Sequence, residues 1–505
     1  MPNSGITRRT VLKSLAATGA SSILGGCLDF AGSSDPARPV PPEFVQPPLR
    51  SAGAGGVLDT SLVTKFASNS VDGKTINTRT YEGIIGGPTL RCRPGQTLRI
   101  RIDNQFPANT DPLPANVNIP HHFNTTNLHT HGLHVSPAGN SDNIFIEIDP
   151  GQSFQYEYRI PADHPCGTFW YHPHKHGSSA IQSLGGMGGT LIIEGGLDDV
   201  PEVAAARDLV YLINELNIDP TTGKTPDFTG DVFLQPNRIL TVNGQVRPTL
   251  TIFTGEVVRL RIVNASTRST IPFAVEGHDL HVLALDGITL PARRTTNAAL
   301  TLAPANRADI LIVGKAEGSY DIMQGVDDSG GQTVPASLLG VLKVLPAVVS
   351  MALPNALPAP ASLPDILASE IKSPGRTLDF QVRPRGGLLP GMSFFSINGA
   401  AFDPAVVNHT IALGSVEEWT LSNASDTEHP FHIHINPFQV VAINGIPLKV
   451  PEWRDTVNIP NKGLQGLPGT VTIRHRFTDF TGKFVLHCHL LIHEDLGMMQ
   501  TVMVV

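Results

Sequence analysis

Histidines recur in pairs along this sequence, with a single residue between the two members of each pair. The four pairs are His129 and His131, His172 and His174, His432 and His434, and His487 and His489. Histidines at positions i and i+2 of a β-strand point to the same side, so each pair can present two imidazoles to one site. Eight imidazoles exceed the needs of one metal ion. The pairs therefore predict a group of three metal ions between the two regions that carry them.

The residue inside the fourth pair is a cysteine, Cys488. On an extended strand its side chain faces away from the two histidines beside it. His429 lies three residues before His432, an odd offset, and should also point away from its pair. Together with His493, these residues form a set of two imidazoles and one thiolate. Such a set, with a distant thioether from Met498, is typical of a blue-copper electron-transfer site.

Alternating apolar strands must position these side chains. Three segments share one pattern: an alternating strand, a turn centred on glycine, and a second alternating strand that ends in or near asparagine. The segments are 87–106, 247–266 and 408–425. The 48 Gly and 42 Pro also favour short strands joined by turns over long helices. We therefore expect an all-β protein built from antiparallel sandwiches.

A chain of 505 residues suits about three domains of common size, and the threefold pattern indicates three related ones. Domains one and three carry the histidine pairs, whereas domain two has none. The predicted boundaries are 56–200, 205–345 and 373–505, with a connector at 346–372 and short helices around 363–372 and after Cys488.

The four pairs, in this order, resemble the motifs of the multicopper oxidases, the family of laccases, ascorbate oxidase and bacterial cuprous oxidases. The resemblance covers roughly residues 80–505. It implies three cupredoxin-like Greek-key β-sandwich domains, four copper ions, and an enzyme that oxidises a small reducing substrate while reducing O2 to water. By this likeness, type 1 copper is held by His429, Cys488, His493 and Met498, type 2 copper by His129 and His432, and the two type 3 coppers by His131, His172, His174, His434, His487 and His489.

Three acids also match the family pattern. Glu494 follows His493 and resembles an acid that supplies protons, and Asp142 resembles the acid near the type 2 and type 3 coppers. Each could instead be a solvated turn residue or a cap. Asp455 more plausibly orients a histidine than carries protons. Methionine at position 498 predicts a low-to-middling type 1 potential for the family, because a coordinating thioether stabilises Cu(II).

The leading functional prediction is a laccase-like oxidase of phenols, aromatic amines and similar small donors. The alternative is a metal oxidase acting on Cu(I), Fe(II) or Mn(II), although the eight methionines form no cluster of the kind that cuprous oxidases often carry. A copper nitrite reductase would need only a type 1 and a type 2 site. A copper-free structural relative would lack ligands, and here every ligand position is filled.

The N-terminus predicts export. Arg8 and Arg9 precede a short apolar stretch, a twin-arginine pattern, and Cys27 ends a sequence that resembles a lipoprotein cleavage box. The protein is expected in the periplasm or cell envelope, with any membrane attachment through a lipid on Cys27. Residues 28–55 are rich in Pro and Gly and predict a flexible tether.

The net charge limits the classes of partner that the sequence predicts. The net charge of −8 argues against nucleic acid as a partner. Enzymes of the family are usually monomers, and we expect a monomer here.

Cys92 and Cys166 could form a disulfide or serve as two buried thiols. His134 would join the first pair only if its strand continued past Gly132, so we expect no metal role for it, and His164 and His475 have no evident partners.

Overall fold

The computed structural model describes residues 41–219, 222–223, 238–329, 333–347, 349–360, 362–372, 375–384, 393–463 and 465–505. The predicted export signal, with Arg8, Arg9 and Cys27, lies outside the described residues. Within them, no helix is long and apolar enough to cross a membrane.

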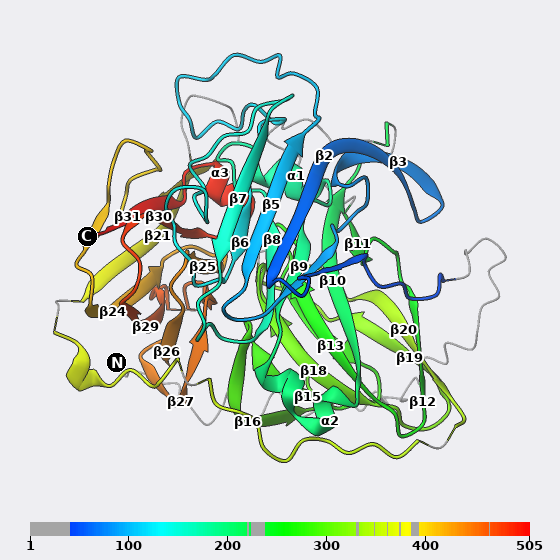
Figure 1. The fold of residues 1–505 in the computed structure, drawn as a ribbon. Helices are drawn as coiled ribbons and strands as arrows, with labels where there is room; N and C mark the ends of the chain where they lie inside the picture. The colour runs from blue at the N-terminus through cyan, green and yellow to red at the C-terminus, as the bar shows by residue number, and fades with distance from the viewer. Residues whose placement is uncertain are drawn as a thin grey trace, which may run out of the picture. The chain divides into compact units, whose positions relative to one another are not determined.

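Six β-sheets pair into three sandwiches that follow one another along the chain (Figure 1). This confirms the predicted all-β fold of three cupredoxin-like domains. In each domain, one sheet contains the parallel pair β2–β5, β10–β13 or β21–β24, and the other contains β4–β9, β12–β20 or β23–β31. The same two parallel strand pairs thus occur in all three domains. The domain boundaries at 56, 205 and 373 stay predictions.

Domain 1 has the sheets β1-β4-β9-β8-β6 and β3-β2-β5-β7. Its strands are β1 (Leu49–Ser51), β2 (Val57–Val71), β3 (Lys74–Tyr81), β4 (Thr89–Cys92), β5 (Thr97–Asn104), β6 (His129–His131), β7 (Ser153–Arg159), β8 (Gly167–His172) and β9 (Gly189–Ile193). The helix α1 (Ser179–Leu184) follows β8, and the 3-10 turn η1 (Gly196–Asp199) and α2 (Pro201–Ala204) lead into domain 2.

Domain 2 has the sheets β11-β10-β13-β18-β15-β16 and β12-β20-β19-β14-β17. Its strands are β10 (Arg207–Asn217), β11 (Arg238–Val242), β12 (Thr249–Phe253), β13 (Val257–Asn264), β14 (Ile271–Val275), β15 (Leu280–Leu285), β16 (Ile288–Thr296), β17 (Leu300–Leu302), β18 (Arg307–Val313), β19 (Gly318–Gln324) and β20 (Ser337–Leu345).

Domain 3 has the sheets β22-β21-β24-β29-β26-β27 and β23-β31-β30-β25-β28. Its strands are β21 (Arg376–Pro384), β22 (Ser393–Ile397), β23 (His409–Ile411), β24 (Ser415–Asn423), β25 (His429–Ile433), β26 (Phe438–Ile443), β27 (Ile446–Arg454), β28 (Thr456–Ile459), β29 (Gly469–Phe477), β30 (Gly482–Cys488) and β31 (Met499–Val504). The 3-10 turn η2 (Ala368–Glu370) precedes this domain and α3 (Leu491–Asp495) follows β30, at the two places where short helices were expected.

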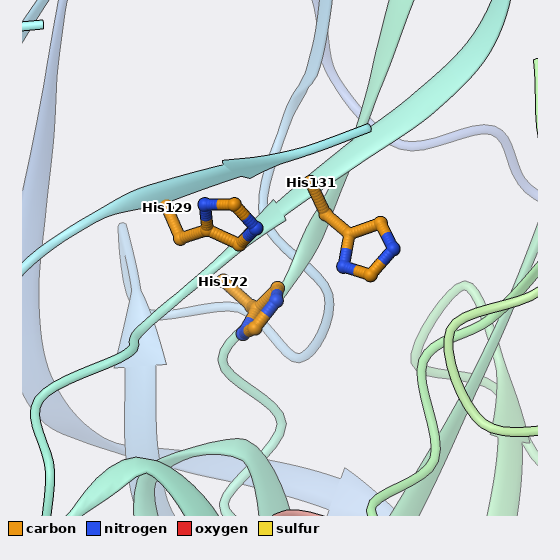
Figure 2. Close-up of side chains that lie close together, drawn as sticks. All are labelled: His129, His131 and His172. Carbon is orange, nitrogen blue, oxygen red and sulfur yellow. The ribbon is translucent and has the colours of Figure 1, made fainter. Parts of the chain in front are cut away.

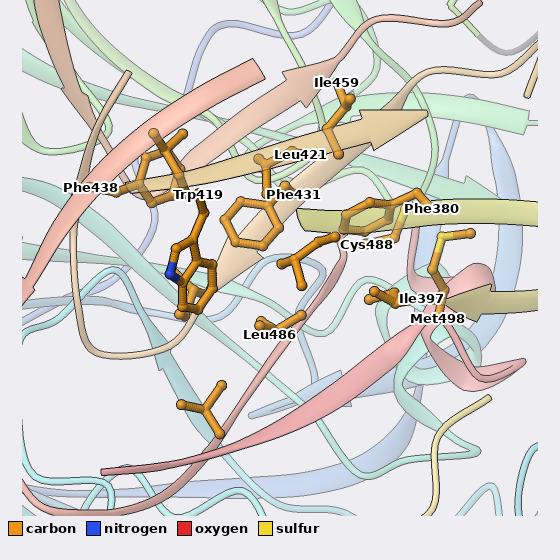
Figure 3. Packing of buried hydrophobic residues seen from close by; sticks show 14 of the residues in the cluster. Phe380, Ile397, Trp419, Leu421, Phe431, Phe438, Ile459, Leu486, Cys488 and Met498 are labelled. Atoms are coloured by element: carbon orange, nitrogen blue, oxygen red, sulfur yellow. The ribbon is translucent and has the colours of Figure 1, made fainter. Parts of the chain in front are cut away.

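Alternation along the strands builds the core of domain 3. Every second residue of β29 is buried, and Val471 and Ile473 point inward with Trp419 and Leu421 of β24. Cys488 and Met498 belong to this same apolar cluster (Figure 3). The thiol and the thioether therefore lie inside a dry domain core, where water is excluded and a soft ligand set is protected.

Strands β10 and β13 depart from alternation, because nearly all their residues are buried. One face packs in the core of domain 2. The other meets domain 1, where Trp170 and Ile192 contact Val210 and Val263 in one apolar cluster. A strand in a sheet that is covered on both faces needs apolar residues at nearly every position, which explains why these two strands do not alternate.

The predicted tether is wrong for residues 41–55. Strand β1 pairs in parallel with β4, and the Phe44 N–H donates to the Thr249 carbonyl at 2.9 Å. The Phe44 ring also stacks on Tyr211, with centroids 5.9 Å apart. Open sheet edges offer unpaired backbone groups, and this segment occupies two of them despite its Pro and Gly content.

The disulfide alternative is also wrong. Cys92 and Cys166 are free thiols. Strand β9 lies between their strands, since Ile193 pairs with Cys92 on one side and with Gly167 on the other. Two strand spacings amount to about 9.6 Å, beyond the reach of a disulfide. Burial raises the pKa of the Cys92 thiol to about 12, so it behaves as a small apolar residue.

Candidate metal centres

Strand register brings the histidine pairs together within each domain. In domain 1, β6 pairs with β8 so that His129 is opposite His172 and His131 is opposite Trp170. In domain 3, β25 pairs with β30 so that His432 is opposite His487 and Phe431 is opposite Cys488. Because facing residues share one side of a sheet, each domain presents one group of imidazoles.

The two groups meet at one buried place. The Nε2 atom of His174 is 3.2 Å from Nε2 of His487 and 3.1 Å from Nε2 of His434. These atoms come from domain 1 and from two strands of domain 3. Three lone pairs directed at one point repel one another unless a cation lies between them. This trio is therefore a candidate metal site.

Two further trios can each place three ligand atoms within 4.8 Å of one another. They are His129, His131 and His172, and His129, His432 and His434. Figure 2 shows the first of them, with the three rings gathered beside strands β6 and β8. The flat faces of the rings also stack, at 3.8 Å between the centroids of His129 and His434 and of His131 and His432.

Several ring nitrogens of the paired histidines are buried and have no hydrogen-bond partner among the described residues: His129 Nε2, His131 Nδ1, His172 Nε2, His432 Nε2 and both nitrogens of His489. Buried polar atoms are normally hydrogen-bonded, so the concentration of unpaired nitrogens at one place indicates a missing partner. Burial, and then the neighbouring imidazoles, lower the pKa of His129, His131, His432, His434 and His489 well below the usual value. Neutral imidazoles offer lone pairs, which is the form that binds metal.

A second centre lies on the other side of β30. Cys488 Sγ is 3.5 Å from His429 Nδ1 and 3.7 Å from His493 Nδ1, and the two nitrogens are 3.3 Å apart. Met498 is attached to the same place through its backbone: its N–H donates to the His493 carbonyl at 2.8 Å, and its carbonyl accepts from the Cys488 N–H at 3.0 Å. His429 and Cys488, whose side chains were predicted to point away from the histidine pairs, thus lie together with His493 and Met498.

The outer nitrogens of the ligand-type histidines are held by carboxylates and carbonyls. Asp142 is 1% exposed and faces His129 Nδ1 at 2.9 and 3.1 Å, while it accepts from the Thr130 N–H at 2.8 Å. Burial raises the pKa of Asp142 to about 7, against the Thr130 hydrogen bonds that lower it. His432 Nδ1 donates to the Asp455 carbonyl at 2.8 Å. In both cases Nε2 is left as the inward lone pair.

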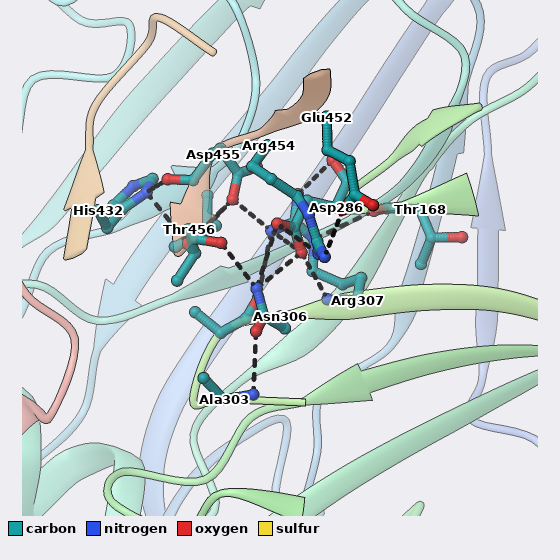
Figure 4. A network of polar contacts seen from close by, with 12 residues as sticks. Thr168, Asp286, Ala303, Asn306, Arg307, His432, Glu452, Arg454, Asp455 and Thr456 are labelled. Carbon is teal, nitrogen blue, oxygen red and sulfur yellow. Dashed lines mark hydrogen bonds and ion pairs between the residues drawn. The ribbon is translucent and has the colours of Figure 1, made fainter. Parts of the chain in front are cut away.

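His131 has the opposite arrangement. Its Nε2 lies 3.2 Å from the Asp455 carboxylate and 3.1 Å from the Thr456 hydroxyl, so Nδ1 is the free nitrogen. Asp455 is in turn held by Arg307 of domain 2, which is fully buried (Figure 4). The five guanidinium N–H groups have five acceptors: both Asp455 oxygens and the carbonyls of Thr168, Ala305 and Asp286. Domain 2 therefore orients a histidine without supplying one.

Glu494 joins two histidines of one trio. Its carboxylate lies 3.3 Å from His174 Nδ1 and 3.2 Å from His487 Nδ1. Burial alone would raise the pKa of Glu494, but these imidazoles and the Ser179 hydroxyl bring it down to about 2. Asp495, which the sequence reading missed, accepts from the Gly177 and Ala180 N–H groups at 2.7 and 2.9 Å.

Other histidines stay outside these groups. His176 bonds the Asn118 side chain at 3.0 Å, and His121 bonds the Ile119 carbonyl at 2.7 Å. In domain 2, His278 and His281 bond Glu276 and Thr295. Arg307 and Ser179 were missed because nothing near them in the sequence points to a metal; Asp495 had one signal, its place in the His-Glu-Asp run after Cys488.

Comparison with known proteins agrees with this geometry. Models of the family described as multicopper oxidase match residues 116–197, 208–340 and 376–505, more than half of the chain. The chain belongs to the multicopper oxidase family. This oxidase is 27% identical to multicopper oxidase mco of Staphylococcus haemolyticus over 455 residues, which cover 86% of this chain and 85% of the relative. It is also 27% identical to a laccase of Bacillus stratosphericus over 473 residues, covering 83% and 89% of the two chains.

Among solved structures, a multicopper oxidase from Campylobacter jejuni, described as a metallo-oxidase, shares the fold with a TM-score of 0.75. The match covers 93% of this chain and 97% of that one at 23% identity. Family membership makes this oxidase a copper-dependent oxidoreductase that uses O2 and a reducing substrate. The residues present fit copper, since the orphan imidazole nitrogens and the thiol are the donors that copper prefers.

Proposed function

We propose that the oxidase is a laccase-like enzyme with one type 1, one type 2 and two type 3 coppers, acting on phenols, aromatic amines and similar small donors. One observation carries this proposal: Cys488 lies with His429 and His493, while its two neighbours lie among the paired histidines, His487 with His174 and His434, and His489 against the rings of His131 and His172. A single residue thus connects two groups that differ in ligand chemistry, as an enzyme needs when electrons enter at one centre and are used at another.

The proposed ligands are those of the sequence analysis. His429, Cys488, His493 and Met498 would hold type 1 copper, His129 and His432 type 2 copper, and His131, His172, His174, His434, His487 and His489 the type 3 coppers. When bound, the coppers supply the one-electron chemistry that couples donor oxidation to the four-electron reduction of O2 to water. The protein fixes the donors, excludes water and moves protons.

Donors would approach at His493. This ring is partly exposed, whereas His429 and Cys488 are fully buried. The Phe395 ring stacks on His493 at 4.1 Å between centroids, and the Ser425 hydroxyl lies 2.9 Å from His429 Nε2. His493 is therefore the ligand of this centre through which a small donor outside the protein can be reached most directly. Met498 would hold type 1 copper together with these residues, and its thioether would then give a low-to-middling potential.

Protons would reach the imidazole centre through Glu494. The Ser179 hydroxyl lies 2.7 Å from a Glu494 oxygen and 3.0 Å from an Asp495 oxygen. A hydroxyl has one proton to donate, so both bonds form only when one of the two acids is protonated. Burial and then Glu494 raise the pKa of Asp495 to about 7, which makes it the protonated partner. The order Asp495, Ser179, Glu494 leads a proton to the edge of the imidazole centre, where the Glu494 carboxylate faces Nδ1 of His174 and of His487. Asp142 would serve the opposite side at His129.

One observation favours the alternative, oxidation of Cu(I), Fe(II) or Mn(II). Glu428 precedes His429, and its N–H donates to the Ser329 carbonyl of domain 2 at 2.8 Å. Burial and the nearby Asp327 raise the pKa of Glu428 to about 7. Two carboxylates in such proximity would bind a cation beside the thiolate centre. The Campylobacter jejuni neighbour described as a metallo-oxidase is in line with this, and the Bacillus laccase with the leading proposal.

Oxygen uptake by copper-loaded enzyme, measured with phenols, Cu(I), Fe(II) and Mn(II) in turn, separates the two proposals. A laccase-like enzyme consumes O2 with organic donors, and replacing Glu428 with Gln leaves that rate unchanged. A metal oxidase loses most of its metal-dependent uptake in the same variant, with Asp279→Asn as the control, a partly exposed residue of domain 2 that pairs with Lys315. Negligible uptake with every organic donor would overturn the laccase proposal.

The proposed location is the periplasm or cell envelope, reached by the twin-arginine route, with attachment through Cys27. We further propose a monomer. Replacing Arg8 and Arg9 by lysines should keep the enzyme in the cytoplasm, as cell fractionation would show. An unchanged distribution would contradict that route.

A further inference from the structure

His134 lies in domain 1, three residues after His131, and both of its ring nitrogens contact domain 3. Nδ1 is 2.6 Å from the Ile435 carbonyl oxygen, and Nε2 is 2.7 Å from a carboxylate oxygen of Asp479. A carbonyl and a carboxylate can only accept hydrogen bonds. Both bonds therefore require a proton on each nitrogen, which is the charged imidazolium form.

The surroundings of His134 support that charge. Its backbone N–H donates to His164 Nε2 at 2.9 Å, and His164 Nδ1 donates to the Pro165 carbonyl at 2.8 Å, so His164 is a neutral tautomer. Burial lowers the pKa of His164 to about 3, which keeps it neutral. Asp163 and Arg476 line the same cavity as Asp479, and Arg476 is paired with Glu370 at 2.8 Å. The Phe480 ring packs edge-on against His134 and adds no charge.

The bond to Ile435 matters because of its backbone. Ile435 has a φ of 58°, in the left-handed region that β-branched residues avoid. After the first histidine pair the same role falls to Gly132, with a φ of 85°, which adopts that region without strain. A strained residue persists only where its surroundings hold it. Ile435 immediately follows His434, and the Asn436 N–H donates back to the His434 carbonyl at 2.7 Å.

We propose that His134, as an imidazolium, is a positioning residue that holds the Ile435 turn and so keeps His434 Nε2 in place against His174. Domain 1 would thereby fasten a domain 3 ligand of the imidazole centre from outside the ligand set. When His134 is neutral, one of its two bonds to domain 3 is lost, so the hold is stronger at low pH. The inference rests on the proposed function only in taking that centre as the copper site.

The test compares His134→Phe, which keeps the contact with Phe480 but removes both hydrogen bonds, with wild type. The control is His281→Phe, a histidine of domain 2 with one hydrogen bond to Thr295. Copper release into a chelator is followed at about pH 5.5 and about pH 8. The blue absorption reports the thiolate centre separately.

At about pH 5.5 His134→Phe should release copper from the imidazole centre several-fold faster than wild type. At about pH 8 the ratio should be smaller, because the neutral form of His134 already lacks one of the two bonds, and the blue band should be unchanged at both pH values. The control should give a ratio of one throughout. A ratio for His134→Phe that is equal at the two pH values, or equal to one at both, overturns the proposal.

Two further measurements keep the proposal testable. Asp479→Asn changes a half-exposed residue, and should reproduce the pH-dependent loss more weakly if the phenylalanine variant does not fold; wild-type release at both pH values would overturn the proposal. In metal-free protein, His134→Phe should lower the unfolding midpoint more at about pH 5.5 than at about pH 8, and an equal effect would overturn it. Wild-type enzyme with far fewer than four coppers would instead contradict the proposed function, whatever the metal-free result.

Discussion

Arg307 shows how much of the candidate site depends on a residue that binds no metal. Its guanidinium is fully buried, and every N–H group has an acceptor, two of them on Asp455. Asp455 in turn faces His131 Nε2 and leaves Nδ1 directed inward. The planar fork of arginine fits this carboxylate, and an ammonium group cannot replace it at the same geometry.

We predict that Arg307→Lys weakens copper binding at the imidazole centre roughly 10- to 100-fold, the usual effect of removing a group that orients a metal ligand. The thiolate centre should keep its blue absorption, because Arg307 contacts none of its residues. Copper retention against a chelator, measured with the blue band as internal reference, checks this. Equal retention in variant and wild type would show that Asp455 holds His131 without help from domain 2.

Glu494 gives a second prediction at this scale. In Glu494→Gln the side chain keeps its size but can no longer take up a proton, so turnover should fall by about 100-fold or more. Copper content and the blue band should stay as in wild type, because the proposed ligands are unchanged. Oxygen uptake at saturating donor, on enzyme of known copper content, makes the comparison. Turnover close to wild type would remove Glu494 from the proton path.

At the scale of the element, the alternation of side chains along β-strands explains most of the site features that were predicted from the sequence. Alternation along β25 and β30 separates His429 and Cys488 from their neighbouring pairs, and pairing of these strands brings the two centres back to back. Parity could not show which strands pair, nor that residues 41–55 occupy open sheet edges, because both depend on contacts between distant parts of the chain. The Arg307 and His134 contacts escaped for the same reason.

Strand β29 supplies a test of stability. His475 is fully buried between Trp419 and Phe477, and neither ring nitrogen has a partner among the described residues. Burial lowers its pKa to about 3, against about 6.5 in an unfolded chain. Between these values the unfolded chain binds a proton that the folded chain does not. His475 therefore destabilises the fold increasingly as pH falls below about 6.5.

Replacing His475 by leucine, which has a similar volume and binds no proton, removes this pH-dependent destabilisation. The free energy of unfolding of the variant relative to wild type should grow by about 2 kcal/mol between pH 7.5 and pH 5, from the linkage of the two pKa values. Denaturant unfolding of metal-free protein at the two pH values measures it. A difference that does not change with pH would mean that His475 is protonated, or finds a partner, in the folded state.

At the scale of the whole molecule, the imidazole centre lies where domains 1 and 3 meet, with ligand-type histidines from both. Metal bound there links the two domains and stabilises only the folded form. We predict that removing copper lowers the midpoint of thermal unfolding, with the loss concentrated in domains 1 and 3. Calorimetry of copper-loaded and metal-free enzyme would detect it. A midpoint indifferent to copper would contradict a metal site between domains.

Three domains, their order and the absence of histidine pairs from domain 2 were predictable from the sequence, because they depend on periodicity and spacing. The part played by domain 2 was not. It orients His131 through Arg307 and offers Asp327 beside Glu428, and both contacts join residues more than 100 positions apart. The electron donor could not be predicted from the motifs either, because the surface around His493, where we propose that it binds, is not part of them.

The central claim is that Cys488 binds one copper while its two neighbours bind others. Copper per chain, determined together with the blue absorption in fully loaded wild type and in Cys488→Ser, tests it most directly. We expect about four coppers and a blue band in wild type, and about three coppers without the band in the variant. Far fewer than four coppers in wild type, or a blue band that survives in Cys488→Ser, would contradict the account.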